Sequence, residues 1–157
     1  MAVEQQHLVD LTALVLNNLK DQHDWTDAQV HDDGQPRPRP MITGLPPKRL
    51  YMHPDEQIEA LELEQSTGKR LSQTPEFEWV LPVHLSEQWT LSTFAAVFDC
   101  IEALPRKSRV SQTPDTLLSR DWRGADRQKR LLLAVVHDDS TVSYYLVHEG
   151  IVKPRQN

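Results

Sequence analysis

The sequence predicts a mixed α/β (α+β) fold: a single domain in which a mixed, mostly antiparallel sheet is flanked by helices. Three observations lead to this prediction. The 157 residues, 38% of them hydrophobic, suit one domain with its own core. Two strand-like runs near the end of the chain are joined by a short polar turn, which predicts an antiparallel hairpin. Segments with helical spacing of apolar residues precede these runs.

The first two predicted helices cover residues 3–20 and 54–68. The first carries apolar residues at helical spacing, which is typical of an amphipathic helix that packs on a core. These residues are Leu8, Leu11, Val15 and Leu19. The second helix is expected to begin at Pro54, whose missing N–H is not needed in a first turn, and to end at Gly68. Its Ile58 and Leu61 are expected to face the core.

The clearest strand in the middle of the chain covers residues 76–85, where apolar and mostly polar side chains alternate. Pro82 lies within it and cannot donate a hydrogen bond to a neighbouring strand, so we expect an edge or a bulge there. Residues 91–104 follow as a third helix, which Thr90 or Ser92 can cap.

Two long segments show neither pattern. Residues 24–50 are proline-rich, which favours an extended, polyproline-like arm, followed by a short strand at 49–52. Residues 106–127 predict a flexible, basic loop. Residues 106–130 hold eight basic and three acidic side chains, a net charge of +5, whereas 54–102 hold two basic and ten acidic, a net charge of −8. A basic segment beside an acidic body suits a protein that docks onto something.

The hairpin near the end of the chain is the most regular part of the sequence. Residues 131–136 are a continuous apolar run, as expected of a strand buried on both faces. Residues 137–141 are turn formers, and residues 142–148 are rich in β-branched and aromatic side chains. After Gly150 a short apolar pair, residues 151–152, extends the second strand.

Composition narrows the class of protein. A single cysteine, Cys100, allows no disulfide within the chain and fits a reducing compartment. The net charge of −6 does not indicate nucleic-acid binding by the whole chain. No apolar run reaches membrane-spanning length and no secretion signal is visible, so we expect no membrane insertion. One histidine, His53, beside Asp55 and Glu56 does not predict a metal site, and no cofactor is expected.

The stretch LLLAVVHDDSTVSYYLVHEGIVKP, residues 131–154, resembles the end of proteins of the tRNA-intron endonuclease family. Within that family it is most similar to the small structural subunit of the eukaryotic tRNA-splicing endonuclease, the Sen-fifteen type. The upstream stretch GLPPKRLYMHPDEQ, residues 44–57, is similar to the fungal branch of that subunit. The resemblance implies the catalytic-domain-like fold of the family over residues 1–157.

Catalytic members of this family cleave RNA with a tyrosine, a histidine and a lysine, without a metal. The resemblance puts Lys129 or Arg130 near the position of the lysine. His84 lies in the segment that should supply the other two groups, but no tyrosine accompanies it. The three tyrosines are Tyr51, Tyr144 and Tyr145, all elsewhere. Because acid–base catalysis needs assembled groups, we expect no catalytic residue and no independent enzyme activity.

The resemblance further implies partners. A structural subunit of this type pairs with a catalytic subunit of the tRNA-splicing endonuclease, within a heterotetramer that acts on precursor tRNA in the nucleus or, in some fungi, on the cytosolic face of the mitochondrial outer membrane. Its last strand pairs with a neighbour, and its acidic loop docks on a catalytic subunit. The expected docking loop is Asp138 and Asp139. The expected interface strand is Val142, Tyr144, Tyr145, Leu146, Val147, Ile151 and Val152.

Two other readings remain open from the residues alone. The first is an RNA-binding module that acts through the basic segment 106–130, where an aromatic ring among cations can stack a base or lie over phosphates. Its candidate contacts are Arg120, Trp122, Arg123, Arg127, Lys129 and Arg130. The second is a homodimer of the isolated chain with no role in RNA processing.

Overall fold

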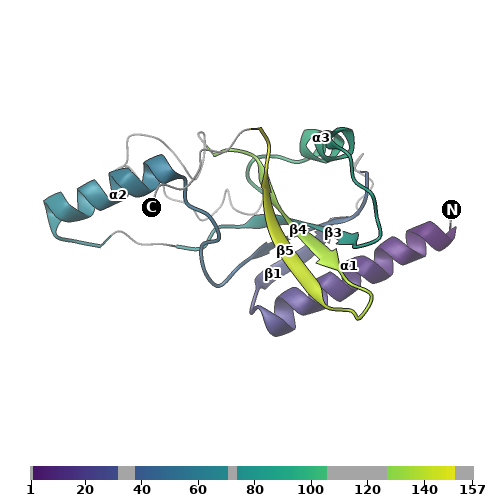
Figure 1. Ribbon diagram of the computed structural model, residues 1–157. Helices are drawn as coiled ribbons and strands as arrows, with labels where there is room; N and C mark the ends of the chain where they lie inside the picture. The colour runs from purple at the N-terminus through teal and green to yellow at the C-terminus, as the bar shows by residue number, and fades with distance from the viewer. Residues whose placement is uncertain (1, 32–37, 71–73, 106–126, 151–157) are drawn as a thin grey trace.

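The computed structural model describes residues 2–31, 38–70, 74–105 and 127–150. These residues form one α+β unit with a five-stranded sheet (Figure 1). The helices are α1 (Ala2–Gln22), α2 (Pro54–Thr67) and α3 (Leu91–Cys100). The strands are β1 (Thr26–His31), β2 (Met41–Leu45), β3 (Glu78–His84), β4 (Arg130–Val136) and β5 (Val142–His148).

The sheet has the strand order β1-β2-β3-β4-β5. All neighbours are antiparallel except β3 and β4, which run parallel and have α3 between them in the chain. The sheet is therefore mixed and mostly antiparallel, and the predicted fold class is confirmed. The predicted hairpin is also confirmed, since β4 and β5 pair over their full length around a turn at residues 137–141.

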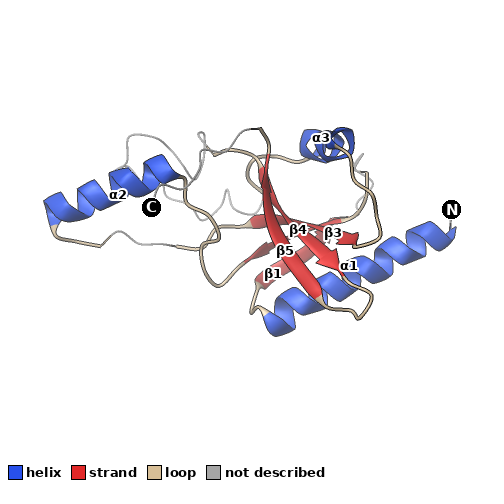
Figure 2. Cartoon of the chain, viewed as in Figure 1, coloured by secondary structure: helices blue, strands red, loops and turns tan. Residues whose placement is uncertain are grey.

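The two faces of the sheet carry separate apolar clusters, with α1 on one side and α3 on the other (Figure 2). Leu11, Val15 and Leu19 of α1 pack on one face, as their spacing predicts. Val97 and Phe98 of α3 pack on the other. The apolar run of β4 divides between the faces by alternation, so that Leu131 serves the α3 side and Ala134 the α1 side. This explains why residues 131–136 of β4 are all apolar.

The proline-rich segment 24–50 differs from the expected arm. Two sheet strands, β1 and β2, lie within its described residues, and 49–52 do not form the expected short strand. β2 is buried because it lies between β1 and β3, and Gly44 is required there by close packing. A Cβ on Gly44 would lie 2.9 Å from the ring of Trp25. The sequence did not predict β2 because its apolar stretch is short and shows no sustained alternation of apolar and polar residues.

Pro82 lies in a central strand, not at an edge of the whole sheet. It is opposite Ala134 of β4, while the pairs between β2 and β3 end at Ile42↔Val80. β2 therefore does not reach Pro82, and on that side the missing N–H interrupts no ladder. The expectation that Pro82 lies at an edge is therefore correct only for the end of β3, where β2 no longer pairs with it.

The second helix has the predicted ends but not the predicted face. Its N-cap is His53, and Gly68 ends it in the left-handed conformation with φ 70°. Ile58 and Leu61 are 46% and 51% exposed instead of packed in the core, because α2 projects away from the sheet (Figure 1). In the described part of the chain no helix combines the length and the apolarity that crossing a membrane requires.

Candidate interaction site

β5 is one edge of the sheet and pairs with β4 over all of its 7 residues without a bulge. Hydrogen bonds from the Glu149 N–H to the Lys129 carbonyl and from the His137 N–H to the Thr141 carbonyl continue the ladder at its ends. Hydrogen-bonded pairs alternate in an antiparallel ladder. Odd-numbered residues of β5 therefore bond to β4, and even-numbered ones, such as Leu146, direct their N–H and C=O to the open edge. Among the described residues no further strand pairs with this edge.

The side chains of β5 divide between the two faces. Val142 and Tyr144 pack on the α1 side, where the Tyr144 hydroxyl donates to Asn18 Oδ1 at 2.6 Å. Burial raises the pKa of Tyr144 to about 12, so it remains a neutral donor. Val147 packs on the α3 side, and Tyr145, on the same face, is 56% exposed. Two members of the predicted interface strand lie outside the described residues: Ile151 and Val152.

The opposite edge of the sheet, β1, is irregular. Its register with β2 shifts between Thr26 and Gln29, and Asp27 adopts φ 50°. Such irregularities discourage pairing with another chain, because they break the regular row of N–H and C=O groups. Of the two edges, β5 is thus the one whose backbone is ready to accept a further strand.

The predicted acidic loop is the tip of the β4–β5 hairpin. The Asp138 side chain is 93% exposed. Asp139 is turned back on the loop, because its Oδ1 accepts hydrogen bonds from the N–H and the hydroxyl of Thr141 at 3.1 and 2.7 Å. These bonds lower the pKa of Asp139. Asp139 therefore shapes the turn, together with Ser140 at φ 68°, and Asp138 presents a carboxylate to the outside.

His84, at the end of β3, lies beside this loop. Its Nδ1 accepts the Ser86 N–H at 3.1 Å, which in a neutral imidazole places the proton on Nε2. Nε2 lies 3.3 Å from Asp138 Oδ1. His84 is therefore in position to orient the exposed carboxylate of the loop.

The basic residues nearest β4 are engaged inside the protein. Arg127 and Arg130 are only 6% and 5% exposed. Arg127 donates to Glu76 Oε2 at 2.8 Å and to Glu78 Oε1 at 2.6 Å. Arg130 donates to the same two atoms, each at 2.8 Å. Arg49 joins this group, with Nη2 2.7 Å from Glu56 Oε2 and 3.5 Å from Glu76 Oε1. We call the six residues the buried clasp: Arg49, Glu56, Glu76, Glu78, Arg127 and Arg130.

The clasp changes the interpretation of the candidate RNA contacts. The guanidinium groups of Arg127 and Arg130 are buried against carboxylates, so they are not available to phosphates. Lys129 is likewise engaged, because its Nζ donates to the Phe98 carbonyl at 2.9 Å. The clasp was missed in the sequence, where its signal was Glu76 and Glu78 on the mostly polar face of the predicted strand 76–85. Outside the described residues lie the other three candidates, Arg120, Trp122 and Arg123.

His148, at the end of β5, lies beside the buried clasp. Its ring lies 4.4 Å from that of Tyr51, edge to face, and Arg130 lies over Tyr51 at 5.4 Å. The His148 Nε2 atom is buried and lacks a hydrogen-bond partner. Burial, the charge of Arg130 and the nearby His53 lower the pKa of His148 to about 4. The imidazole is therefore neutral at physiological pH.

Among the described residues, His84, Lys129 and Tyr144 do not lie together at one site. His84 is beside the acidic loop, Lys129 is at the end of α3, and Tyr144 is bonded to α1. Tyr51, His148 and Arg130 do lie together, but inside the clasp. Among the described residues no group of three or more histidine, cysteine or carboxylate side chains is placed to hold a metal ion. The β5 edge, Tyr145 and the acidic loop form the candidate surface for contact with another protein.

The buried clasp predicts a large stability defect when one carboxylate is neutralised. Glu78→Gln leaves two buried guanidinium groups with one carboxylate fewer, which should lower the free energy of unfolding by about 3–5 kcal/mol. Urea denaturation measures this change. The matched control is Glu62→Gln on the exposed surface of α2, which should change stability by less than about 0.5 kcal/mol. Equal effects of the two substitutions would show that the clasp does not support the fold.

The depressed pKa of His148 predicts a loss of stability in mild acid. In the unfolded chain this imidazole binds a proton near pH 6.5, whereas in the folded chain it does so only near pH 4. The unfolded state is therefore favoured progressively as pH falls between these values, by about 1–2 kcal/mol for a half-buried group, and the loss is complete below pH 4. Urea denaturation at about pH 7.5 and about pH 4.5 should show a smaller acid-induced loss in His148→Phe than in the wild type. Equal losses would contradict the assignment.

Comparisons with known proteins identify the family. The family model described as Sen15 protein matches residues 14–157. The "Probable tRNA-splicing endonuclease subunit tsp-1" of Neurospora crassa is 55% identical over 152 residues, which cover 97% of this chain and 68% of that protein. The "tRNA-splicing endonuclease subunit SEN15" of Eremothecium gossypii is 32% identical over 150 residues, covering 96% and 93%. A "Probable tRNA-splicing endonuclease subunit sen15" of Schizosaccharomyces pombe is 32% identical over 81 residues, 51% and 50% of the two chains. The family resemblance drawn from the sequence is confirmed, and the chain belongs to the Sen15 family.

Proposed function

We propose that this chain is a structural, non-catalytic subunit of a tRNA-splicing endonuclease, the complex that removes introns from precursor tRNAs. Three relatives carry the name of a subunit of that enzyme. In this proposal β5 pairs with a strand of a catalytic subunit, and the acidic loop docks on a catalytic subunit elsewhere in the heterotetramer. The complex would act in the nucleus or, as in some fungi, on the outer surface of the mitochondrion.

The observation that carries the proposal is the asymmetry of the sheet edges. β5 is regular, with the open row of even-numbered backbone groups, and Tyr145 is exposed beside it. Strand addition at such an edge supplies affinity from main-chain hydrogen bonds and specificity from neighbouring side chains. Tyrosine is also frequent among the residues that contribute most to binding. β1, by contrast, is interrupted by the register shift between Thr26 and Gln29.

The acidic loop supports the second contact. Asp138 is exposed at the tip of a rigid hairpin and lies close to His84. A carboxylate in that position can enter a cationic pocket of a partner, where hydrogen bonds between charged groups are about twice as strong as neutral ones. Asp139 fixes the backbone that carries it, which keeps the ordering cost of docking small.

The RNA-binding alternative rests on Arg120, Trp122 and Arg123, which lie outside the described residues. Arg127, Lys129 and Arg130 do not favour it, because each is engaged within the fold. If the isolated chain binds RNA through this segment, its affinity should fall steeply as salt rises.

The first prediction is that the isolated chain does not cleave RNA, because His84, Lys129 and the tyrosines do not form one acid–base site. Purified protein and an intron-containing precursor tRNA are incubated with and without EDTA, and products are separated on a gel. The reconstituted endonuclease is the positive control. Cleavage at the splice sites by the isolated chain would refute the non-catalytic role.

The second prediction isolates the open backbone edge of β5. Leu146→Pro removes an outward N–H together with the side chain, whereas Leu146→Ala removes only the side chain. Both variants should lose similar stability, so the difference between them reports strand pairing. Leu146→Pro should bind the catalytic subunit at least about tenfold more weakly than Leu146→Ala, measured by surface plasmon resonance. Equal affinities would exclude β5 as the pairing strand.

The third prediction separates a charged docking loop from a plain turn. Asp138→Asn/Asp139→Asn keeps the side-chain oxygen that accepts from Thr141, so the melting temperature of the isolated chain should change little. Assembly of the complex should weaken by about 2–5 kcal/mol if the carboxylates become buried against cations. Because salt screens charges, the gap between wild type and variant should narrow as salt rises. If the wild type and the variant assemble equally well at low salt, the loop is a plain turn and does not dock through its charge.

A further inference from the structure

Two neighbouring strands and the first helix come together around His84, at the end of β3. The Leu85 N–H donates to the Val136 carbonyl at 2.9 Å, which ties the end of β3 to the end of β4. The His7 ring of α1 lies edge to face with the His84 ring, with 6.1 Å between their centroids. On the hairpin side, His84 Nε2 lies 3.3 Å from Asp138 Oδ1. His84 therefore connects the acidic loop to the body of the fold.

The backbone and the ring of His84 are both held in place. Glu87 Oε2 accepts the His84 N–H at 2.6 Å. Glu87 is itself fixed by Arg39, whose side chain is 9% exposed and donates to Oε1 at 2.6 Å and to Oε2 at 3.2 Å. Ser86 engages one ring nitrogen of His84, with its backbone N 3.1 Å and its hydroxyl 2.7 Å from Nδ1. The other ring nitrogen, Nε2, is thus left to face Asp138.

The two carboxylates of the acidic loop are held in different ways. Asp139 bonds within the loop, to Thr141. Asp138 instead contacts His84, a residue of another strand. Because the Asp138 side chain is 93% exposed, this contact leaves its carboxylate accessible to a partner. The loop therefore presents one carboxylate that is oriented but not covered.

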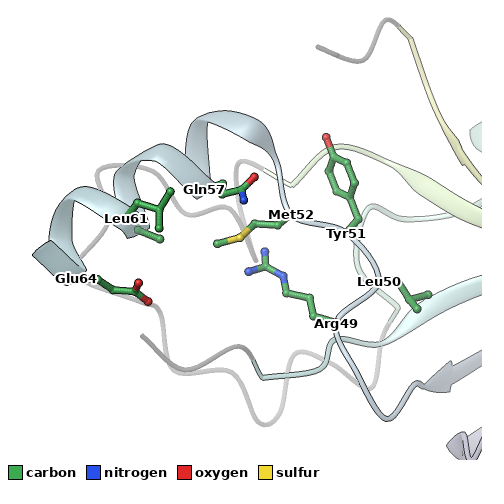
Figure 3. Close-up of a pocket in the computed structure, with 8 residues that line it drawn as sticks. Arg49, Leu50, Tyr51, Met52, Gln57, Leu61 and Glu64 are labelled. Carbon is green, nitrogen blue, oxygen red and sulfur yellow. The ribbon is translucent and has the colours of Figure 1, made fainter. Parts of the chain in front are cut away.

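The pocket between residues 49–52 and α2 differs from the loop in its charge (Figure 3). It has a volume of about 330 Å³, and its lining includes one acidic and one basic side chain, Glu64 and Arg49. Such a balanced lining does not favour a partner of either sign. The exposed carboxylate of Asp138, by contrast, is complementary to a cation.

We infer that His84 is a positioning residue for docking of the acidic loop. It holds Asp138 in one orientation before the loop meets a cationic pocket of another subunit, so that less side-chain entropy is lost on binding. An exposed pair of this kind contributes modestly, so its removal should weaken docking about two- to fivefold. The inference rests on the proposed function, in which this loop docks on a catalytic subunit.

The first test uses the isolated chain. NMR couplings between the Hα and the two Hβ protons of Asp138 report whether its side chain occupies one rotamer or averages over several. They should indicate one dominant rotamer in the wild type and averaging in His84→Phe, which keeps a ring but removes both nitrogens. The control is Gln88→Ala, an exposed position in the same segment, which should leave the couplings unchanged. Averaging in the wild type would overturn the inference.

The second test is a double-mutant cycle on the reconstituted endonuclease. Surface plasmon resonance measures binding of the full chain to the other subunits for the wild type, His84→Phe, Asp138→Ala and the double variant. His84→Phe should weaken binding about two- to fivefold when Asp138 is present, but less than about 1.5-fold when Asp138 is already alanine, because His84 acts through this carboxylate. A purely structural role of His84 would weaken binding equally in both backgrounds.

The outcomes separate this inference from the proposed function. If Asp138→Ala weakens assembly but His84→Phe does not, the loop docks without help from His84. The same conclusion follows if His84→Phe has equal effects in the two backgrounds. If Asp138→Ala assembles like the wild type, the docking contact of the proposed function fails, and the role of His84 fails with it.

Discussion

The buried clasp is the interaction on which the rest of this fold depends. Glu76 and Glu78 lead into β3, while Arg127 and Arg130 lead into β4, and the two pairs are about 50 residues apart in the chain. A buried charge without a partner is strongly destabilising, so these four groups can be accommodated only together. Their pairing fixes the beginnings of two parallel strands that no short turn connects. Arg49 extends the same constraint to residues 49–52, the segment that precedes α2.

Once β4 is fixed, the hairpin places the whole candidate site. β5 pairs with β4 through a short turn, so the position of β4 determines where the open edge of β5, Tyr145 and the acidic tip lie. The clasp fixes the position of β4. His148 ties the far end of β5 back to the clasp through Tyr51. A surface carried by a rigid scaffold in this way loses little conformational entropy when a partner binds.

Several side chains of this protein, considered one at a time, suggest catalysis or RNA binding. In the described part of the structure, most of them make contacts that support the fold instead. Arg127 and Arg130 neutralise carboxylates, Lys129 ends α3, and Tyr144 binds α1. At the β5 edge and the acidic loop, Tyr145 and Asp138 stay exposed. Such a surface is suited to protein partners more than to a phosphate backbone.

The sequence by itself determined what depends on neighbours in the chain. Apolar spacing defined α1, Pro54 and Gly68 bounded α2, and the turn at 137–141 joined β4 to β5, because caps, turns and periodicity act over a few residues. Only the tertiary structure decided the rest. The strands β1 and β2 are short and gain their burial from β3, the outward position of Ile58 and Leu61 follows from where α2 projects, and the burial of Arg127 and Arg130 depends on carboxylates about 50 residues away. The strands that become neighbours determine which charged side chains pair. Local sequence patterns do not specify those neighbours.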